Sequence, residues 1–145
     1  MESLVRSASA SAEAVSRQIG AAIKPTILIA EDHVDSREAM RELLEAFGFE
    51  VIEAGNGRQA VSVALEQGPR LILMDVMMPE MDGFQAIKEL RKQPATRTTP
   101  IIALTAMDGA RELALHAGAN DFVRKPVDIR RLIGLVNGWI SRESH

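Results

Sequence analysis

The sequence predicts an α/β fold in which a doubly wound, five-stranded parallel sheet is covered by helices on both faces. From Thr26 onward, five short apolar runs alternate with longer stretches of helical periodicity. Three of these runs are almost wholly apolar, as strands buried on both faces of a parallel sheet must be. Because parallel strands are joined by right-handed crossovers, the (βα)5 pattern predicts the flavodoxin-like strand order 2-1-3-4-5.

The second apolar run alternates acidic and apolar residues, which is typical of an edge strand. The five strands are expected over residues 27–30, 50–54, 71–75, 101–105 and 121–124.

Turn-forming residues mark the expected helix ends. Asp35 followed by Glu38 predicts a capping-box-like start for the first helix, and Gly48 its end. Asn56 is expected to open the second helix, which Gly68 ends. The last three helices are expected over residues 83–93, 110–117 and 128–141.

A length of 145 residues suits one domain of ordinary size with a modest extension. Pro25 separates an N-terminal stretch rich in Ala and Ser from the first apolar run. We therefore expect an extension over residues 1–24, a domain over residues 25–141 and a tail over residues 142–145. The extension is expected to be either flexible or a weakly amphipathic helix.

Composition and charge exclude several classes of function. The absence of cysteine excludes disulfides and thiolate metal sites and fits a reducing cytoplasm. A net charge of -3 with both signs interspersed does not favour direct DNA binding. No apolar run approaches the roughly 20 residues that cross a bilayer. We therefore expect a cytoplasmic protein that binds neither DNA nor membranes.

In open parallel sheets the functional site lies beyond the carboxyl ends of the strands. Three carboxylates, one hydroxyl and one amine stand at that end of four predicted strands: Glu31, Asp32, Asp75, Thr105 and Lys125. Clustered carboxylates repel one another, and Mg²⁺ relieves that repulsion. An amine and a hydroxyl facing the same ion are best explained by an anion between them, which indicates phosphate. Each residue alone has an ordinary structural explanation, such as a cap or a surface charge, but their coincidence favours a site.

Four segments resemble the receiver domain of two-component response regulators: residues 27–32, 71–83, 101–106 and 117–126. The Asp-x-x-Met-Pro-x-Met-Asp-Gly stretch that begins at Asp75 is highly specific, and a Thr-Ala and a Lys-Pro pair follow downstream. The resemblance covers residues 26 to about 141, so the chain is similar to the CheY-like single-domain response regulators.

The resemblance implies that Asp75 is the phosphoacceptor, which takes a phosphoryl group from a sensor histidine kinase or a histidine phosphotransfer protein. It implies that Thr105 and Lys125 contact the phosphoryl oxygens. The chain would then be a switch in a phosphorelay rather than an enzyme, one that promotes its own phosphorylation and slow dephosphorylation.

The resemblance also implies that Mg²⁺ is bound by Asp32, Asp75 and the backbone carbonyl of Met77, with Glu31 contributing directly or through water. Glu31 stands where the family commonly has aspartate, so the water-bridged contact is the safer expectation.

The same resemblance implies a switch in which Thr105 moves toward the phosphate and Phe122 turns inward, and a cis peptide bond between Lys125 and Pro126. The segment between Thr105 and Phe122 looks shorter than is usual for the family, which bears on the switching surface. Output is expected through a downstream protein target, with a homodimer contact from the extension left open.

Two other functions remain open. A receiver-fold interaction module that works without phosphorylation would not need all five site residues. A haloacid-dehalogenase-like phosphatase usually has a second aspartate two residues after the nucleophile, where this sequence has Met77, and a cap domain for which no insertion is long enough.

Overall fold

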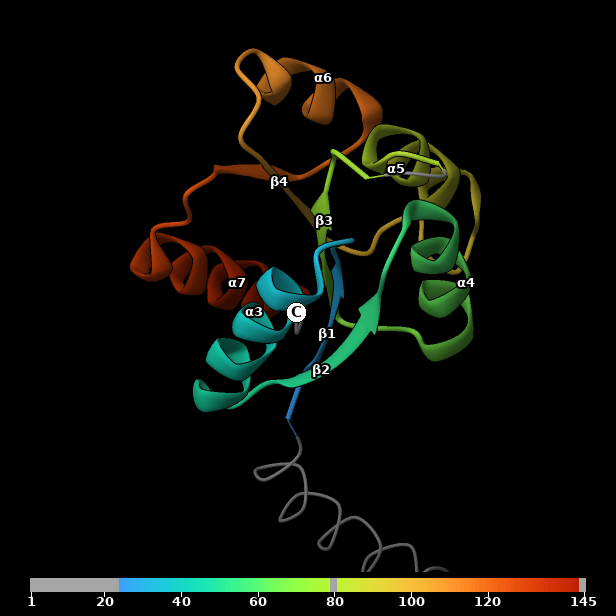
Figure 1. Ribbon diagram of the computed structural model, residues 1–145. Coiled ribbons are helices and arrows are strands. Elements are labelled where there is room, and N and C mark those ends of the chain that lie inside the picture. Colours follow the sequence, from blue (N-terminus) through green and yellow to red (C-terminus); the bar gives the residue numbers. More distant parts are fainter. Residues whose placement is uncertain (1–23, 79–80, 144–145) are drawn as a thin grey trace, which may run out of the picture.

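The computed structural model describes residues 24–78 and 81–143, which fold into three layers with the sheet in the middle (Figure 1). The sheet is five-stranded and parallel, in the order β2-β1-β3-β4-β5, which confirms the predicted fold class and strand order. Its strands are β1 (Thr26–Ala30), β2 (Glu50–Ala54), β3 (Leu71–Asp75), β4 (Ile101–Thr105) and β5 (Asp121–Arg124). The predicted N-terminal extension, up to residue 23, lies outside the described residues.

One helix follows each strand: α3 (Val34–Ala46), α4 (Gly57–Gln67), α5 (Gly83–Lys92), α6 (Ala110–Ala117) and α7 (Ile129–Glu143). Helices α3 and α7 cover one face of the sheet, and α4, α5 and α6 cover the other (Figure 1). The helix ends agree with the predicted ones to within two residues, apart from the way in which α3 begins.

A hydrophobic core lies on each face of the sheet because successive side chains of a strand point to opposite sides. Leu28, Ile72 and Met74 belong to the core under α4, α5 and α6. Ile27 and Leu73 belong to the core under α3 and α7. Strands β3 and β4 are buried at every residue, whereas the edge strand β2 is buried only at its last residue. The central strands therefore hold their carboxyl ends in fixed positions for a site.

The capping box predicted for the first helix is wrong. Helix α3 begins at Val34 with His33 as its N-cap residue, and the side chain of His33 makes no capping hydrogen bond. The carboxylate of Glu31 accepts the His33 backbone N–H at 3.1 Å, so the chain turns into the helix directly after β1. Asp35 lies in the first helical turn, where its negative charge interacts favourably with the positive end of the helix dipole.

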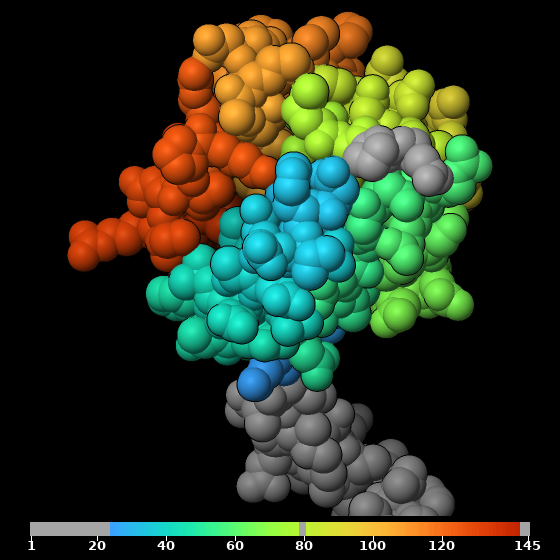
Figure 2. All heavy atoms as spheres, viewed as in Figure 1, coloured from blue at the N-terminus to red at the C-terminus, as the bar shows by residue number. Residues whose placement is uncertain are grey.

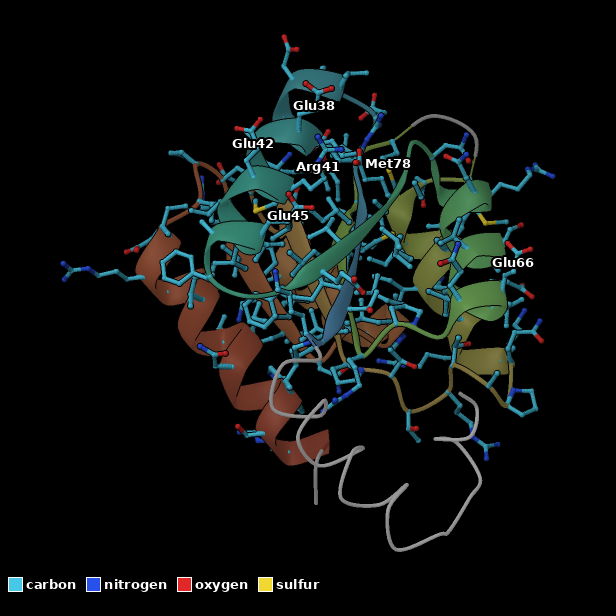
Figure 3. All side chains as sticks on the ribbon, turned by 90° about the horizontal axis from the view of Figure 1, so that it is seen from below. Glu38, Arg41, Glu42, Glu45, Glu66 and Met78 are labelled. Carbon is cyan, nitrogen blue, oxygen red and sulfur yellow. The ribbon has the colours of Figure 1, made fainter. Side chains whose placement is uncertain are left out.

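The outward faces of α3 and α4 carry acidic side chains. Figure 3 shows Glu38, Glu42 and Glu45 projecting from α3, and Glu66 from α4; all four residues are exposed. The opposite side of α3 buries Leu44 against the sheet, so this helix is amphipathic in the usual sense of a surface helix. No helix within the described ranges is long and apolar enough to span a membrane.

Candidate functional site

The carboxyl ends of the strands meet at one edge of the sheet. Figure 2 shows three segments from this edge on a common face: the segment leading into α3 (light blue), the start of α5 (yellow-green) and the segment leading into α7 (orange-red). The polar residues predicted from the sequence lie on these segments and at the ends of β3 and β4.

Lys125 joins two of the predicted carboxylates. Its Nζ atom donates hydrogen bonds to Glu31 Oε1 and to Asp75 Oδ2, both at 2.8 Å. The two carboxylate side chains are only 5% exposed, and that of Lys125 is 28% exposed. The Lys125 backbone N–H donates to the Thr105 carbonyl at 2.8 Å, and the Lys125–Pro126 peptide bond is cis. A single ammonium therefore serves two buried carboxylates.

Burial and charge act in opposite directions on these three groups. Burial raises the pKa of Asp75, and the neighbouring Glu31 adds to this rise, although Lys125 and the Met77 N–H oppose it. Burial also acts to raise the pKa of Glu31, but hydrogen bonding, first from Lys125, outweighs it and holds that pKa well below its usual value. Burial acts to lower the pKa of Lys125, yet its two carboxylate partners raise it on balance. Lys125 thus stays charged at neutral pH.

Asp32 has an unsatisfied acceptor. Its Oδ1 atom is buried and accepts no hydrogen bond. Every other buried side-chain nitrogen or oxygen atom in the part of the chain that the structure describes has a hydrogen-bond partner. The ring nitrogen Nδ1 of His33 lies 3.6 Å from this oxygen and 3.3 Å from Glu31 Oε2. A buried carboxylate oxygen without a donor is unfavourable unless a cation contacts it. The oxygen-rich donor set and this orphaned atom fit a hard divalent cation such as Mg²⁺.

Asp75 and Thr105 are held by the loops that follow them. Asp75 Oδ1 accepts the backbone N–H of Met77 at 2.8 Å, and Thr105 Oγ1 accepts that of Met107 at 2.9 Å. Asp75 pairs in register with Leu104, so Thr105 lies one residue further along the neighbouring strand. The two strand-end side chains are thus fixed in similar ways on adjacent strands.

Phe122, the other residue predicted to take part in switching, lies on β5 opposite Ala103 of β4. It is half-buried and packs against the core under α4, α5 and α6.

The family model of the response regulator receiver domain matches residues 27–137 of this chain. The chain belongs to the response regulator receiver family. Two proteins illustrate the similarity in sequence. The polar-differentiation response regulator DivK of Brucella anthropi is 34% identical over 79% of this chain and 95% of its own length. An uncharacterised 14.6 kDa protein of Leptolyngbya boryana is 44% identical over 78% of this chain and 88% of its own length.

Solved receiver structures share the fold. One of them is the receiver domain of the sensor histidine kinase PA1611 from Pseudomonas aeruginosa, which has a magnesium ion coordinated in its active site cleft. It superimposes on this chain with a TM-score of 0.77 at 37% sequence identity, and the alignment covers 82% of this chain and 99% of that domain. The chemotaxis protein CheY4 of Vibrio cholerae gives a TM-score of 0.74 at 28% identity, covering 79% of this chain and 98% of its own.

These similarities assign the receiver domain to phosphorelay signalling, the function that its sequence predicts. The two alternatives, a phosphorylation-independent module and a dehalogenase-like phosphatase, are not favoured. DivK is named a response regulator and CheY4 a chemotaxis protein, which agrees with a role in signalling.

Two residues of the receiver site were missed by sequence reasoning. His33 approaches Glu31 and Asp32, and its place directly after two acids is the signal that was overlooked. Arg37 donates from Nη1 to the backbone carbonyl of Glu31 at 2.8 Å and from Nε to Glu53 Oε1 at 2.7 Å. Glu53 lies on β2 and Glu31 directly after β1, so nothing in the sequence marks Arg37 as part of the site.

A cavity of about 280 Å³ opens beside the receiver site, between α3 and the start of α7. Met40 and Leu43 line it on the α3 side, and Pro126 and Ile129 on the opposite side, while Lys125 lies on its wall. The cavity therefore reaches the site at Glu31 and Lys125.

Proposed function

We propose that this receiver domain is phosphorylated on Asp75 by a phosphohistidine, carried by a sensor histidine kinase or a histidine phosphotransfer protein. The observation that supports this most strongly is the pair of 2.8 Å hydrogen bonds from Lys125 to Asp75 and Glu31. They keep a buried carboxylate beside a cation at the carboxyl end of a central strand. A phosphoryl transfer needs the carboxylate as nucleophile and the cation to neutralise the phosphoryl oxygens.

The proposed reaction is a direct phosphoryl transfer. A carboxylate oxygen of Asp75 attacks the phosphorus, a P–O bond forms as the P–N bond to the imidazole breaks, and the imidazole nitrogen leaves with the electron pair and takes up a proton. Such transfers need positioning and neutralisation of charge more than covalent help from the protein. Lys125 would neutralise the phosphoryl oxygens, and the hydroxyl of Thr105 would donate a hydrogen bond to one of them.

Mg²⁺ would be held by Asp32, Asp75 and the backbone carbonyl of Met77, with Glu31 contributing through water. When bound, the ion supplies positive charge against the phosphoryl oxygens. The orphaned Asp32 Oδ1 supports this assignment, as does the magnesium ion in the related PA1611 receiver domain. Glu31 already binds Lys125 and the His33 N–H, which leaves it better suited to an indirect contact.

Phosphorylation would act by shifting the population between two conformations, with Thr105 moving toward the phosphate and Phe122 turning inward. The output would be contact with a downstream protein target, without direct binding to DNA or membranes, and the acyl phosphate would be lost slowly. The chain would thus be a switch, not an enzyme. We also propose a cytoplasmic location, which fits the absence of cysteine, and leave a homodimer contact through the N-terminal extension as an option.

The experiment is incubation with acetyl phosphate and Mg²⁺ followed by intact-mass measurement. The wild type should gain one phosphoryl group, and Asp75→Asn should gain none because an amide is too weak a nucleophile. Asp35→Asn, which changes an exposed aspartate on α3, is the matched control and should behave as wild type. An unmodified wild type, or an Asp75→Asn variant that is still phosphorylated, would contradict the proposal.

A further inference from the structure

The loop between β3 and α5 rests on the first residue of α4. Gly57 is buried there, and a Cβ atom added to it would lie 1.8 Å from the carbonyl oxygen of Met81. The same atom would lie 2.8 Å from the Met81 carbonyl carbon and 3.2 Å from the Asp82 carbonyl oxygen. All three are backbone atoms, which cannot turn away as a side chain can. Only glycine therefore fits at this position with the loop where it is.

The other end of the loop is fixed as tightly. The Gly83 N–H donates to the Val76 carbonyl at 3.2 Å. A Cβ on Gly83 would lie 2.4 Å from both the Asp75 carbonyl oxygen and the Val76 Cα. The start of α5 thus packs directly on the backbone of Asp75 and Val76.

Met81 has a backbone conformation that its neighbours must enforce. Its φ is +52°, in the left-handed region that residues other than glycine rarely adopt. Such a conformation persists only where the surroundings enforce it. Gly57 is in contact with this very residue.

The loop carries backbone groups of the phosphoacceptor site. The Met77 N–H donates to Asp75 Oδ1 at 2.8 Å, and the Met77 carbonyl is one of the proposed Mg²⁺ ligands. A loop pushed away from α4 would therefore misplace both groups relative to Asp75.

We propose that Gly57 is a positioning residue for the phosphoacceptor site: through its contact with Met81 it sets the position of the β3–α5 loop and hence of the Met77 backbone around Asp75. This inference rests on the proposed function. Gly57 itself touches neither the metal nor the phosphoryl group, and its effect is carried by the loop.

The test compares Gly57→Ala with Gly134→Ala, which adds the same methyl group on α7 where nothing lies within 4 Å. Mg²⁺ is titrated into each ¹⁵N-labelled variant well below its melting temperature, and the backbone amide shifts are followed by NMR. Displacing a group that orients a metal ligand typically weakens metal binding 10- to 100-fold, so Gly57→Ala should raise the Kd for Mg²⁺ at least about tenfold. Gly134→Ala should stay at the wild-type value, and a merely destabilised but folded variant would also keep that value.

A folded Gly57→Ala variant with the wild-type Kd and an unshifted Met77 amide would overturn the positioning role. The double variant Gly57→Ala/Met81→Gly provides a second route if Gly57→Ala alone does not fold, because glycine at position 81 lets the backbone move away from the added methyl group. It should also raise the Kd, and a folded double variant with the wild-type Kd would overturn the proposal. Failure of the proposed function would show differently, as a wild-type protein that does not bind Mg²⁺.

Discussion

Lys125 and Arg91 are both half-buried cations at opposite ends of the same sheet, and their surroundings differ. Lys125 lies at the carboxyl end between two carboxylates, which raise its pKa against the effect of burial. Arg91 lies at the amino end, where burial lowers its pKa. The Arg91 guanidinium donates to five neutral oxygens at 2.7 to 3.1 Å: the backbone carbonyls of Thr96, Arg97, Thr99 and Gly118 and the side-chain carbonyl of Asn120.

The difference separates a structural charge from one that we propose to be functional. The hydrogen bonds of Arg91 connect the end of α5 to the segments before β4 and β5. Its guanidinium already has acceptors there and needs no ligand to supply them. Around Lys125, two buried carboxylates share one ammonium, and the Oδ1 atom of Asp32, which follows Glu31 in the sequence, has no donor. That imbalance costs stability unless a cation or a phosphoryl group completes the cluster. We therefore expect substitutions at the two ends to affect stability with opposite signs.

Arg91→Met should have the largest effect on stability. It leaves the buried acceptors without their donors, and the loss should be about 3 kcal/mol of unfolding free energy. Urea denaturation measures it, with Arg97→Met as the control, because the side chain of Arg97 is exposed. A loss no larger than that of the control would mean that the Arg91 cluster does not stabilise the fold.

Asp75→Asn should have a smaller effect of the opposite sign in Mg²⁺-free buffer. Burial and Glu31 raise the pKa of Asp75, so the ionised carboxylate costs stability at neutral pH. Asparagine removes that cost, although its single amide oxygen can accept from Lys125 or from the Met77 N–H and not from both. We therefore expect a net gain of about 1 kcal/mol. Saturating Mg²⁺ should stabilise the wild type more than the variant and so reduce the difference between their free energies of unfolding. A marked loss of stability in Asp75→Asn would remove the contrast with Arg91.

Glu53 should give the smallest effect, and it depends on pH. Burial acts to raise its pKa, but Arg37 and Arg41 outweigh this and lower it. A lowered pKa in the folded state means that the ion pair stabilises the protein above the ordinary pKa of glutamate and is lost as the pH falls below it. Glu53→Gln should therefore cost less than about 1 kcal/mol at pH 7, and nothing once the wild-type carboxylate is protonated. Thermal melts of both proteins between pH 7 and pH 3 measure this, and a difference that persists at low pH would exclude the ion pair as its cause.

The sequence was sufficient for the sheet and for the residues at its carboxyl end. Buried parallel strands are almost wholly apolar, so the polar residue that ends each one, such as Asp75 or Thr105, stands out. The sequence did not reveal residues that act through contacts with residues far away in the chain. Arg91 near the end of a helix has the pattern of a solvated charge, and Gly57 looked like an ordinary residue after a cap. The capping box at Asp35 failed because a side chain of the site itself, Glu31, takes the N–H that begins the turn into α3.

Chemical trapping would identify the phosphorylated residue itself. Borohydride reduces an acyl phosphate to an alcohol, so an aspartyl phosphate becomes homoserine, which peptide mass spectrometry locates. After incubation with acetyl phosphate, we expect homoserine at position 75 and only when Mg²⁺ is present. Homoserine at another aspartate such as Asp32, or no reduced residue in a protein that binds Mg²⁺, would contradict the assignment of Asp75 as the phosphoacceptor.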